Sequence, residues 1–446
     1  MTTDNPTSAP AGDFLDVLSR WNRWGRAQLS PGFARQIVAR LAPFLETSDV
    51  VALIGPRRAG KTTVLYQVME RLRTQGVPEQ AMLHLNFEEP ALGPELGPEL
   101  LDRLYRTYRT RVWPTGRAYL FLDEVQHVDG WERWVRARHD TEDVKIFLTG
   151  SSTQLFSREL GTRLTGRHVS FRVMPLSFDE NLRFRGLEPP EDPRLAGEPP
   201  EIVFALRSYL SWGGFPEVVL ADSDQRREVL LRQYFDDVLF KDVALRHEVR
   251  DVATLRNLAV HLLSQTGSLV TFKRVAGVFG VSLDLARAYC GYLEEAFLLS
   301  LVPFQTLKTA ERRRRPQKVH AVDLGMRNAV TLGLSPDWGH LAETAVSHHL
   351  TSSSAGDLAY WQGEHEVDFV VRRGTEVEQL IQVAFGDLER SDLRERELRG
   401  LAEAGKRFPE AKRTLVVDQW PPGFAVPEAT NVVPLWRFLL GEGEEA

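Results

Sequence analysis

The sequence contains little cysteine, little net charge and no long apolar run. Its single cysteine, Cys290, excludes an intramolecular disulfide and is typical of a reducing compartment. A formal charge of −6 over 446 residues argues against wholesale nucleic-acid binding, so a DNA contact would require a local basic patch. The polar N-terminus lacks the apolar core of a signal peptide, and no run reaches the ~18 apolar residues that span a membrane. These absences predict a cytoplasmic protein without a membrane partner.

A chain of this length exceeds what one hydrophobic core serves, so we expect two to four domains. Between residues 50 and 152, short apolar strands alternate with helical segments, which predicts a parallel sheet with flanking helices. The expected strands are 50–54, 82–87, 118–124 and 145–151. Ser177 and Glu180 have capping-box spacing and predict a helix after the last strand.

The strongest motif is GPRRAGKT, which fits G-x-x-x-x-G-K-[ST]. Its glycines allow a tight loop whose N–H groups cradle phosphates, and a strand precedes and a helix follows, as the motif requires. Lys61 is expected to reach the β- and γ-phosphates of ATP, and the Thr62 hydroxyl to ligate Mg²⁺. The predicted nucleotide-binding residues are Gly55, Pro56, Arg57, Arg58, Ala59, Gly60, Lys61, Thr62 and Thr63.

A second carboxylate site follows in AYLFLDE. Asp123 is expected to hold the Mg²⁺ through water, and Glu124 to polarise the attacking water, which favours hydrolysis over mere binding. The next strand ends in polar residues 149–152, where we expect a γ-phosphate sensor, with Ser151 as the candidate. An ordinary polar strand end is the alternative.

Arg163 and Arg167 follow this strand. Charge on a transferring γ-phosphoryl group is commonly neutralised by an arginine, supplied in cis or by a neighbouring subunit. A solvated basic helix face explains either residue equally well.

Several further segments reinforce one resemblance. Together with the P-loop they resemble the AAA-type ATPases of bacteria and archaea, in particular the branch whose ATPase module precedes a restriction-endonuclease-like domain of unknown function. The resemblance implies ASCE-class ATP hydrolysis, a homo-oligomer such as a hexameric ring, and Arg163 or Arg167 acting across the subunit interface. The segments are LDEVQ (122–126), LTGSS (148–152), the Leu-Thr-Gly-Arg segment ending at Arg167, PLSFDE (175–180), GGFPEV (213–218) and KVHAVDLGMRNAV (318–330).

Residues 271–304 read as helix, turn, helix and strand, which suggests a winged helix. The second helix has Arg287 as its only cation, which argues against reading of bases in the major groove. The basic residues come after the strand, where a net charge of +5 is positioned to hold DNA phosphates without regard to sequence. A solvated loop or a contact for an acidic partner is the alternative. The predicted DNA-binding residues are Lys308, Arg312, Arg313, Arg314, Arg315 and Lys318.

The C-terminal segment carries part of a metal-dependent nuclease motif. Glu343 matches the helix acid and Asp368 the strand acid, but Gln382 replaces a third carboxylate and Ala384 replaces the lysine. An amide is a poor ligand for a hard cation, and without the lysine no cation stabilises the phosphate charge. We therefore expect a degenerate nuclease site without activity, used for folding, assembly or DNA contact.

These observations predict an α/β fold: a P-loop NTPase parallel sheet with a helical lid, then a winged helix and a restriction-endonuclease-like α/β domain. The expected boundaries are 1–180 for the ATPase core, 181–265 for a linker and lid, 266–318 for the winged helix and 319–446 for the nuclease-like domain. The functional hypothesis is an oligomeric, Mg²⁺-dependent ATPase that binds or remodels DNA. The alternatives are a signalling or defence ATPase switch with protein-binding C-terminal domains, and an ATP-dependent nuclease.

Overall fold

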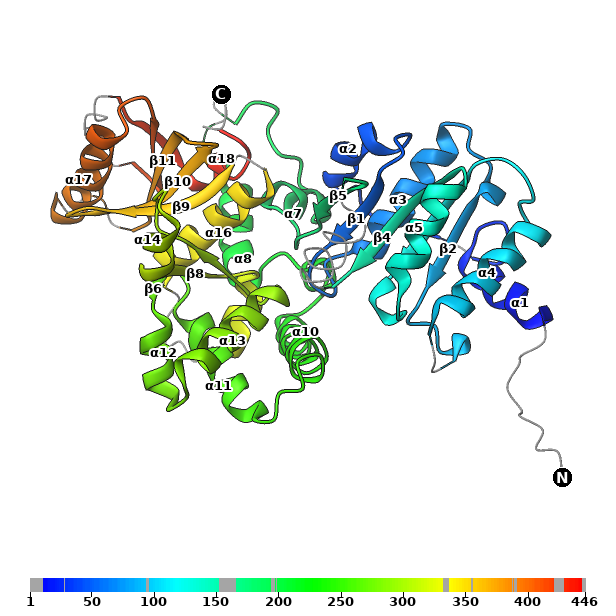
Figure 1. The fold of residues 1–446 in the computed structure, drawn as a ribbon. Helices are drawn as coiled ribbons and strands as arrows, with labels where there is room; N and C mark the ends of the chain where they lie inside the picture. The colour runs from blue at the N-terminus through cyan, green and yellow to red at the C-terminus, as the bar shows by residue number, and fades with distance from the viewer. Residues whose placement is uncertain are drawn as a thin grey trace. The chain divides into compact units, whose positions relative to one another are not determined.

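The computed structural model describes residues 11–27, 29–93, 96–151, 166–193, 197, 199–331, 337–353, 356–386, 388, 391–420 and 429–442. The chain divides into two compact units, residues 1–173 and 174–446, each with its own sheet or sheets. Both units mix helices with sheets, so the predicted α/β class is confirmed (Figure 1).

The first unit is built on a five-stranded parallel sheet in the order β2-β3-β4-β1-β5. The four predicted strands occur within one residue of their expected bounds, and one strand is added at the edge. Because β4 separates β1 from β3, the P-loop strand and the strand that ends in Asp123 are not neighbours. The strands are β1 (Val50–Ile54), β2 (Met82–Asn86), β3 (Ala118–Asp123), β4 (Val144–Gly150) and β5 (His168–Arg172).

Helices lie alongside this sheet, in the blue-to-cyan part of Figure 1. Their apolar sides close over β1, β3 and β4, whose residues are buried throughout. Since all strands are parallel, the loops after β1, β3 and β4 emerge at one edge of the sheet, where ligands bind in such folds. The helices are α1 (Ala11–Trp21), α2 (Ile37–Leu41), α3 (Lys61–Thr74), α4 (Pro98–Arg111) and α5 (Trp131–Thr141).

The second unit begins with helices. The Ser177 hydroxyl accepts from Glu180 N at 3.2 Å and the Glu180 carboxylate accepts from Ser177 N at 3.1 Å, so the predicted capping box is confirmed. Residues 201–265 are largely helical, as expected. The elements are α7 (Phe178–Phe184), α8 (Pro200–Trp212), α9 (Pro216–Val219), α10 (Asp224–Asp237), a π-helix (Val238–Leu245) and α11 (Val252–Ser264).

A small helical and three-stranded part follows. Its sheet is antiparallel in the order β6-β8-β7, and the loop from β7 to β8 contains the basic run. The predicted succession of helix, turn, helix and strand is present. The elements are β6 (Ser268–Val270), α12 (Phe272–Phe279), α13 (Leu283–Glu295), β7 (Leu299–Val302), α14 (Thr309–Arg314) and β8 (Gln317–Ala321).

The last part is a mixed five-stranded sheet in the order β13-β12-β11-β10-β9. Alternate residues of its strands enter two different cores: Phe369 and Ile381 pack with α16 and α8, while Val370 and Leu380 pack with α17. The elements are α15 (Leu324–Val330), α16 (Trp338–Ser352), β9 (Asp357–Gln362), β10 (Glu366–Arg373), β11 (Glu376–Ala384), α17 (Ser391–Arg407), β12 (Lys412–Val417), β13 (Asn431–Pro434) and α18 (Leu435–Phe438).

Two segments noted in the sequence, GGFPEV and KVHAVDLGMRNAV, interlock in the second unit. The buried Asp323 carboxylate accepts from Gly214 N at 2.8 Å and from Met326 N at 2.8 Å, so it caps α15 and holds the turn after α8. A Cβ at Gly325 would lie 2.0 Å from Trp212 O, which explains the glycine. These contacts join the end of α8 to the start of α15.

No helix in the described ranges is both long and apolar enough to cross a bilayer.

Candidate functional site

The P-loop runs from the end of β1 to the start of α3. A Cβ at Gly55 would lie 2.0 Å from Val173 O, so a side chain there would collide with the backbone that follows β5. Gly60 has φ of +93°, a left-handed conformation that favours glycine. The two glycines are therefore required by the path of the loop.

The Lys61 ammonium lies inside the curve of this loop and is buried. It donates to Gly55 O at 3.1 Å and to Pro56 O at 3.2 Å, and its Nζ lies 3.2 Å from Glu124 Oε1. The lysine thus bridges the loop that follows β1 and the carboxylate that follows β3.

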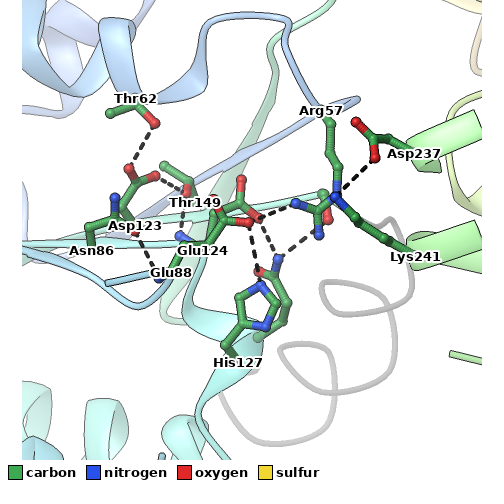
Figure 2. A network of polar contacts seen from close by, with 12 residues as sticks. Arg57, Thr62, Asn86, Glu88, Asp123, Glu124, His127, Thr149, Asp237 and Lys241 are labelled. Atoms are coloured by element: carbon green, nitrogen blue, oxygen red, sulfur yellow. Dashed lines mark hydrogen bonds and ion pairs between the residues drawn. The ribbon is translucent and has the colours of Figure 1, made fainter. Parts of the chain in front are cut away.

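Asp123 lies between two hydroxyl groups, Thr62 and Thr149 (Figure 2). Thr62 Oγ1 donates to Asp123 Oδ2 at 2.7 Å, and Thr149 Oγ1 donates to Asp123 Oδ1 at 2.5 Å. His84 Nε2 lies 3.7 Å from Asp123 Oδ2. Burial acts to raise the pKa of Asp123, but His84 and the two hydroxyls outweigh burial and leave the pKa lowered, so the carboxylate is ionised.

Glu124 is held in a sharp turn after β3. Its φ is +53°, which is unusual for a residue with a side chain, and its N–H donates to Thr149 Oγ1 at 2.7 Å. Burial is the largest influence and acts to raise its pKa, but the Lys61 ammonium, the Gln126 amide and Arg57 together outweigh burial and the nearby Asp123, so the pKa is lowered. The structure therefore presents an ionised carboxylate at the edge of the sheet where the P-loop lies.

These residues fit a nucleotide with a divalent cation. Thr62 and Asp123 supply a hydroxyl and a carboxylate oxygen within 2.7 Å of each other, the hard donors that Mg²⁺ takes in P-loop proteins. The left-handed turn at Gly60 and the start of α3 leave the first backbone N–H groups of the helix available to phosphate oxygens.

Sequence reasoning missed several residues of this site. Thr149 joins Asp123 to Glu124, although only the general polarity of residues 149–152 had been noted. Gln126 donates to the Glu124 carboxylate and, at 3.3 Å, to Ser151 Oγ. The predicted sensor Ser151 is therefore linked to Glu124 through the Gln126 side chain. His84, the partner of Asp123, could have been found from the sequence, because a histidine inside an otherwise apolar strand is unusual.

A segment before β1 also supports the P-loop. The buried Arg35 donates from its guanidinium Nη1 to Ala59 O at 2.7 Å, and its backbone N–H donates to Gln67 Oε1 at 3.1 Å. Gln67 Nε2 donates to Pro31 O and Phe33 O, both at 2.6 Å. Residues 31–35 are therefore tied to both the loop and α3.

Arg57, at the outer side of the P-loop, turns toward Glu88, with 2.7 Å between Nη1 and Oε1 (Figure 2). His127 Nε2 lies 3.8 Å from the same carboxylate oxygen. Arg58 has φ of +66°. These contacts place one P-loop arginine in a partly exposed ion pair beside the site.

Arg167 lies at the opposite edge of the sheet from its own P-loop. Its carbonyl accepts from Val50 N at 2.8 Å, at the start of β1, and its Nε lies 3.2 Å from Asp140 Oδ1. A five-residue strand spans roughly 16 Å, so Arg167 does not reach the P-loop of its own subunit. Arg163 lies outside the described residues.

The basic run forms α14 and its flanks. The side chains of Lys308, Arg312, Arg314 and Arg315 are exposed, while the side chain of Arg313 lies outside the described residues. The Arg315 guanidinium stacks 4.6 Å from the centre of the Phe304 ring.

The prediction that Lys318 contacts DNA is wrong. Its side chain is 1% exposed and points into the protein, because Lys318 belongs to β8 and pairs with Leu269 on one side and Val302 on the other. Without it, five cations and one acid remain between residues 308 and 315, a net charge of +4.

The four residues of the predicted degenerate nuclease site line one cavity of about 450 Å³. Asp368 lies where the pairing of β10 with β9 shifts register. It accepts from Lys318 Nζ at 2.7 Å and from Val383 N at 2.9 Å. Gln382 is engaged on both sides, accepting from Asp368 N at 3.2 Å and donating to Glu397 Oε2 at 2.6 Å.

Glu343 completes this group from α16, and its Oε1 lies 2.8 Å from Lys318 Nζ. Burial raises the pKa of Glu343 to about 8, with Lys318 opposing and Asp368 adding to the rise. No group of three or more His, Cys, Asp or Glu side chains suited to a metal ion occurs among the residues that the structure describes. Sequence reasoning missed Lys318 and Glu366 as members of this cluster, since neither belongs to the expected motif.

Comparison with known proteins agrees with the geometry of the first unit. Residues 47–182 match the family model of an AAA domain, and residues 203–337 match a domain of unknown function (DUF8612). An uncharacterized protein of Methanocaldococcus jannaschii is 28% identical over 422 residues, covering 91% of this chain and 90% of that protein. An uncharacterized protein of Haemophilus influenzae is also 28% identical, covering 78% of this chain and 85% of that one.

Among solved structures, the Aeropyrum pernix ORC1 protein in complex with DNA is 15% identical, with a TM-score of 0.30. The match covers 66% of this chain and 90% of that chain. Residues 47–182 thus match an AAA domain, and the P-loop and the strand order of the first unit agree with that match.

Proposed function

We propose that this protein is an oligomeric, Mg²⁺-dependent ATPase that binds DNA without regard to sequence and carries an inactive nuclease-like domain. The observation that supports ATP hydrolysis most directly is the convergence of Lys61, Thr62, Asp123 and Glu124 at one edge of the sheet. Binding alone would not need an ionised Glu124 held in a left-handed turn.

The residues have separable roles in this proposal. Thr62 and Asp123 would hold Mg²⁺, which supplies charge neutralisation at the phosphates. Lys61, which is bound to two loop carbonyls and to Glu124, would exchange its contact with Glu124 for phosphate oxygens. Glu124 is then free to accept a proton from the attacking water, a role that ionised carboxylates fill in general base catalysis. ATP would in this way release its own catalytic base.

The place of Arg167 supports the proposal of an oligomer. The arginine is a strand length from the P-loop of its own subunit, so any action on a γ-phosphate requires a neighbouring copy. Its ion pair with Asp140 is partly exposed and therefore worth little, so breaking it at an interface costs little.

DNA binding is proposed for the loop between β7 and β8. A net charge of +4 within eight residues, with the side chains of Lys308, Arg312, Arg314 and Arg315 exposed, suits contact with phosphates. The preceding helix α13 offers little for base reading, because its only cation, Arg287, lies 3.5 Å from Asp284. The contact would therefore be independent of sequence.

The test is ATP turnover by the full chain, at a determined oligomeric state, with single-stranded, duplex and branched DNA. We expect DNA to raise the rate, and the same DNA to have no effect when Arg312 and Arg314 are both changed to alanine. Turnover unaffected by any DNA would favour the switch with protein partners. Cleavage of the DNA, lost on Asp368→Ala, would favour the nuclease.

A further inference from the structure

Lys318 lies at the centre of the carboxylate cluster in the C-terminal part. Its Nζ is 2.8 Å from Glu343 Oε1, 2.6 Å from Glu366 Oε1 and 2.7 Å from Asp368 Oδ1. A lysine ammonium has three protons to donate; Lys318 donates a hydrogen bond to Asp368, and Glu343 and Glu366 lie within ion-pair distance. One buried cation is therefore coordinated by three acids.

The three acids come from two elements of the fold. Glu343 lies on α16, while Glu366 and Asp368 lie on β10 on either side of Val367. The lysine comes from β8, the central strand of the small three-stranded sheet. Each carboxylate alone is a weak partner, but together they surround a single point at 2.6–2.8 Å.

Carboxylate oxygens of this kind can also coordinate a divalent cation where no ammonium lies among them. Glu343 and Asp368 are the acids that the nuclease motif assigns to metal binding, and hard divalent ions prefer such carboxylate oxygens. The adjoining cavity of about 450 Å³ is lined by Glu364, His365 and Glu366 among others, so polar groups line the space beside the cluster. In this protein the Lys318 ammonium fills that position.

We propose that Lys318 is a built-in cation that occupies the position of a divalent metal ion between Glu343, Glu366 and Asp368. The ammonium prevents a metal ion from binding to these acids, and replacing Lys318 by an uncharged residue allows Mg²⁺ or Mn²⁺ to bind. The nuclease motif also places a lysine at position 384, where this chain has alanine. The Lys318 ammonium supplies a positive charge in the same cluster, but it blocks metal binding and is not a catalytic group. ATP hydrolysis has no part in this proposal.

A single positive charge fixed by the chain explains two features together. Glu343 and Asp368 can remain buried without a metal because the Lys318 ammonium lies beside both, whereas an unpaired buried charge would be strongly unfavourable. The Gln382 amide donates to Glu397 and accepts from Asp368 N, so both of its ends have partners other than Lys318. Without a metal ion, no third oxygen ligand is needed from this position.

The experiment measures Mn²⁺ binding to the full chain without nucleotide, by the electron paramagnetic resonance signal of free Mn²⁺. Four proteins are compared: wild type, Lys318→Met, Asp368→Asn and the double variant. Methionine keeps an unbranched side chain that is one atom shorter and carries no charge. We expect Lys318→Met to gain one Mn²⁺ site that the double variant weakens about 10–100-fold, the usual effect of disturbing a metal's surroundings. Wild type and Asp368→Asn should titrate alike.

Three results would overturn the proposal. One is folded Lys318→Met, judged by circular dichroism, without an added site. Another is an Mn²⁺ site in the wild-type protein that is lost in Asp368→Asn. The comparison of these two proteins remains decisive even if Lys318→Met does not fold. The third is Mn²⁺-dependent DNA cleavage by wild type that is lost in both Lys318→Met and Asp368→Asn, which would make the lysine catalytic.

Discussion

Replacing Thr149 by valine tests how the two carboxylates of the ATP site are held. Thr149 is buried, and its hydroxyl donates to the ionised Asp123 at 2.5 Å while accepting from the Glu124 N–H at 2.7 Å. Valine has nearly the same shape and no hydroxyl. The substitution therefore removes two hydrogen bonds without opening a cavity.

The expected cost follows from these two bonds. A hydrogen bond to a charged group contributes about 1.5–3 kcal/mol, and a buried N–H left without a partner costs about 1–3 kcal/mol. We expect a loss of about 3 kcal/mol from the free energy of unfolding of the first unit. For a unit of this size the melting temperature should fall by roughly 6–12 °C.

The same change should slow ATP turnover. Glu124 occupies a left-handed turn that is unfavourable by about 1–3 kcal/mol, and the Thr149 hydroxyl is one of the groups that hold it there. Without that bond the carboxylate has more freedom, and a misplaced general base loses much of its effect.

Differential scanning calorimetry of the full chain provides the measurement, read on the transition that Mg-ATP raises. The control is Thr149→Ser, which keeps the hydroxyl and removes one methyl group, at a cost of about 1 kcal/mol. If valine and serine variants melt within about 1 °C of each other, the hydroxyl does not carry the two bonds and the reasoning fails.

Four further outcomes are expected. Lys61→Ala should abolish turnover, while Glu124→Gln should still bind labelled ATP but hydrolyse it about 10²–10⁴-fold more slowly; normal turnover of the glutamine variant would contradict its role as base. Arg167→Ala should be inactive alone and regain activity when mixed with Lys61→Ala, because hybrid interfaces combine an intact P-loop with an intact arginine; a fully active monomer would refute this. Changing Arg312–Arg315 to alanine should lower the salt dependence of DNA binding by about 0.9 for each lost phosphate contact, whereas an unchanged slope points to a protein partner. Asp323→Ala should lower the free energy of unfolding by about 2–4 kcal/mol in denaturant titrations, and Asp323→Asn by less, since asparagine still accepts from backbone N–H groups.

Local sequence determined most of the first unit and the first helix of the second. The strands 50–54 and 118–123, the P-loop and the capping box at Ser177 are patterns of a few adjacent residues, each with one favourable local structure. Once the strands are parallel, their carboxyl ends share an edge, so the meeting of Lys61 with Asp123 and Glu124 follows from the motifs and the class of sheet.

Only the tertiary structure decided the contacts between distant segments. Lys318 stands at the end of a basic run and resembles its exposed neighbours, yet pairing of β8 with β6 and β7 turns it inward onto acids 25 to 50 residues away. Thr149 is one polar residue among several at a strand end, and its bridging role exists only because β4 lies beside β3. Local sequence determines helices, strands and turns through short-range sterics and hydrogen bonds. The direction in which a charged side chain points depends on which strands become neighbours, and that is a property of the whole chain.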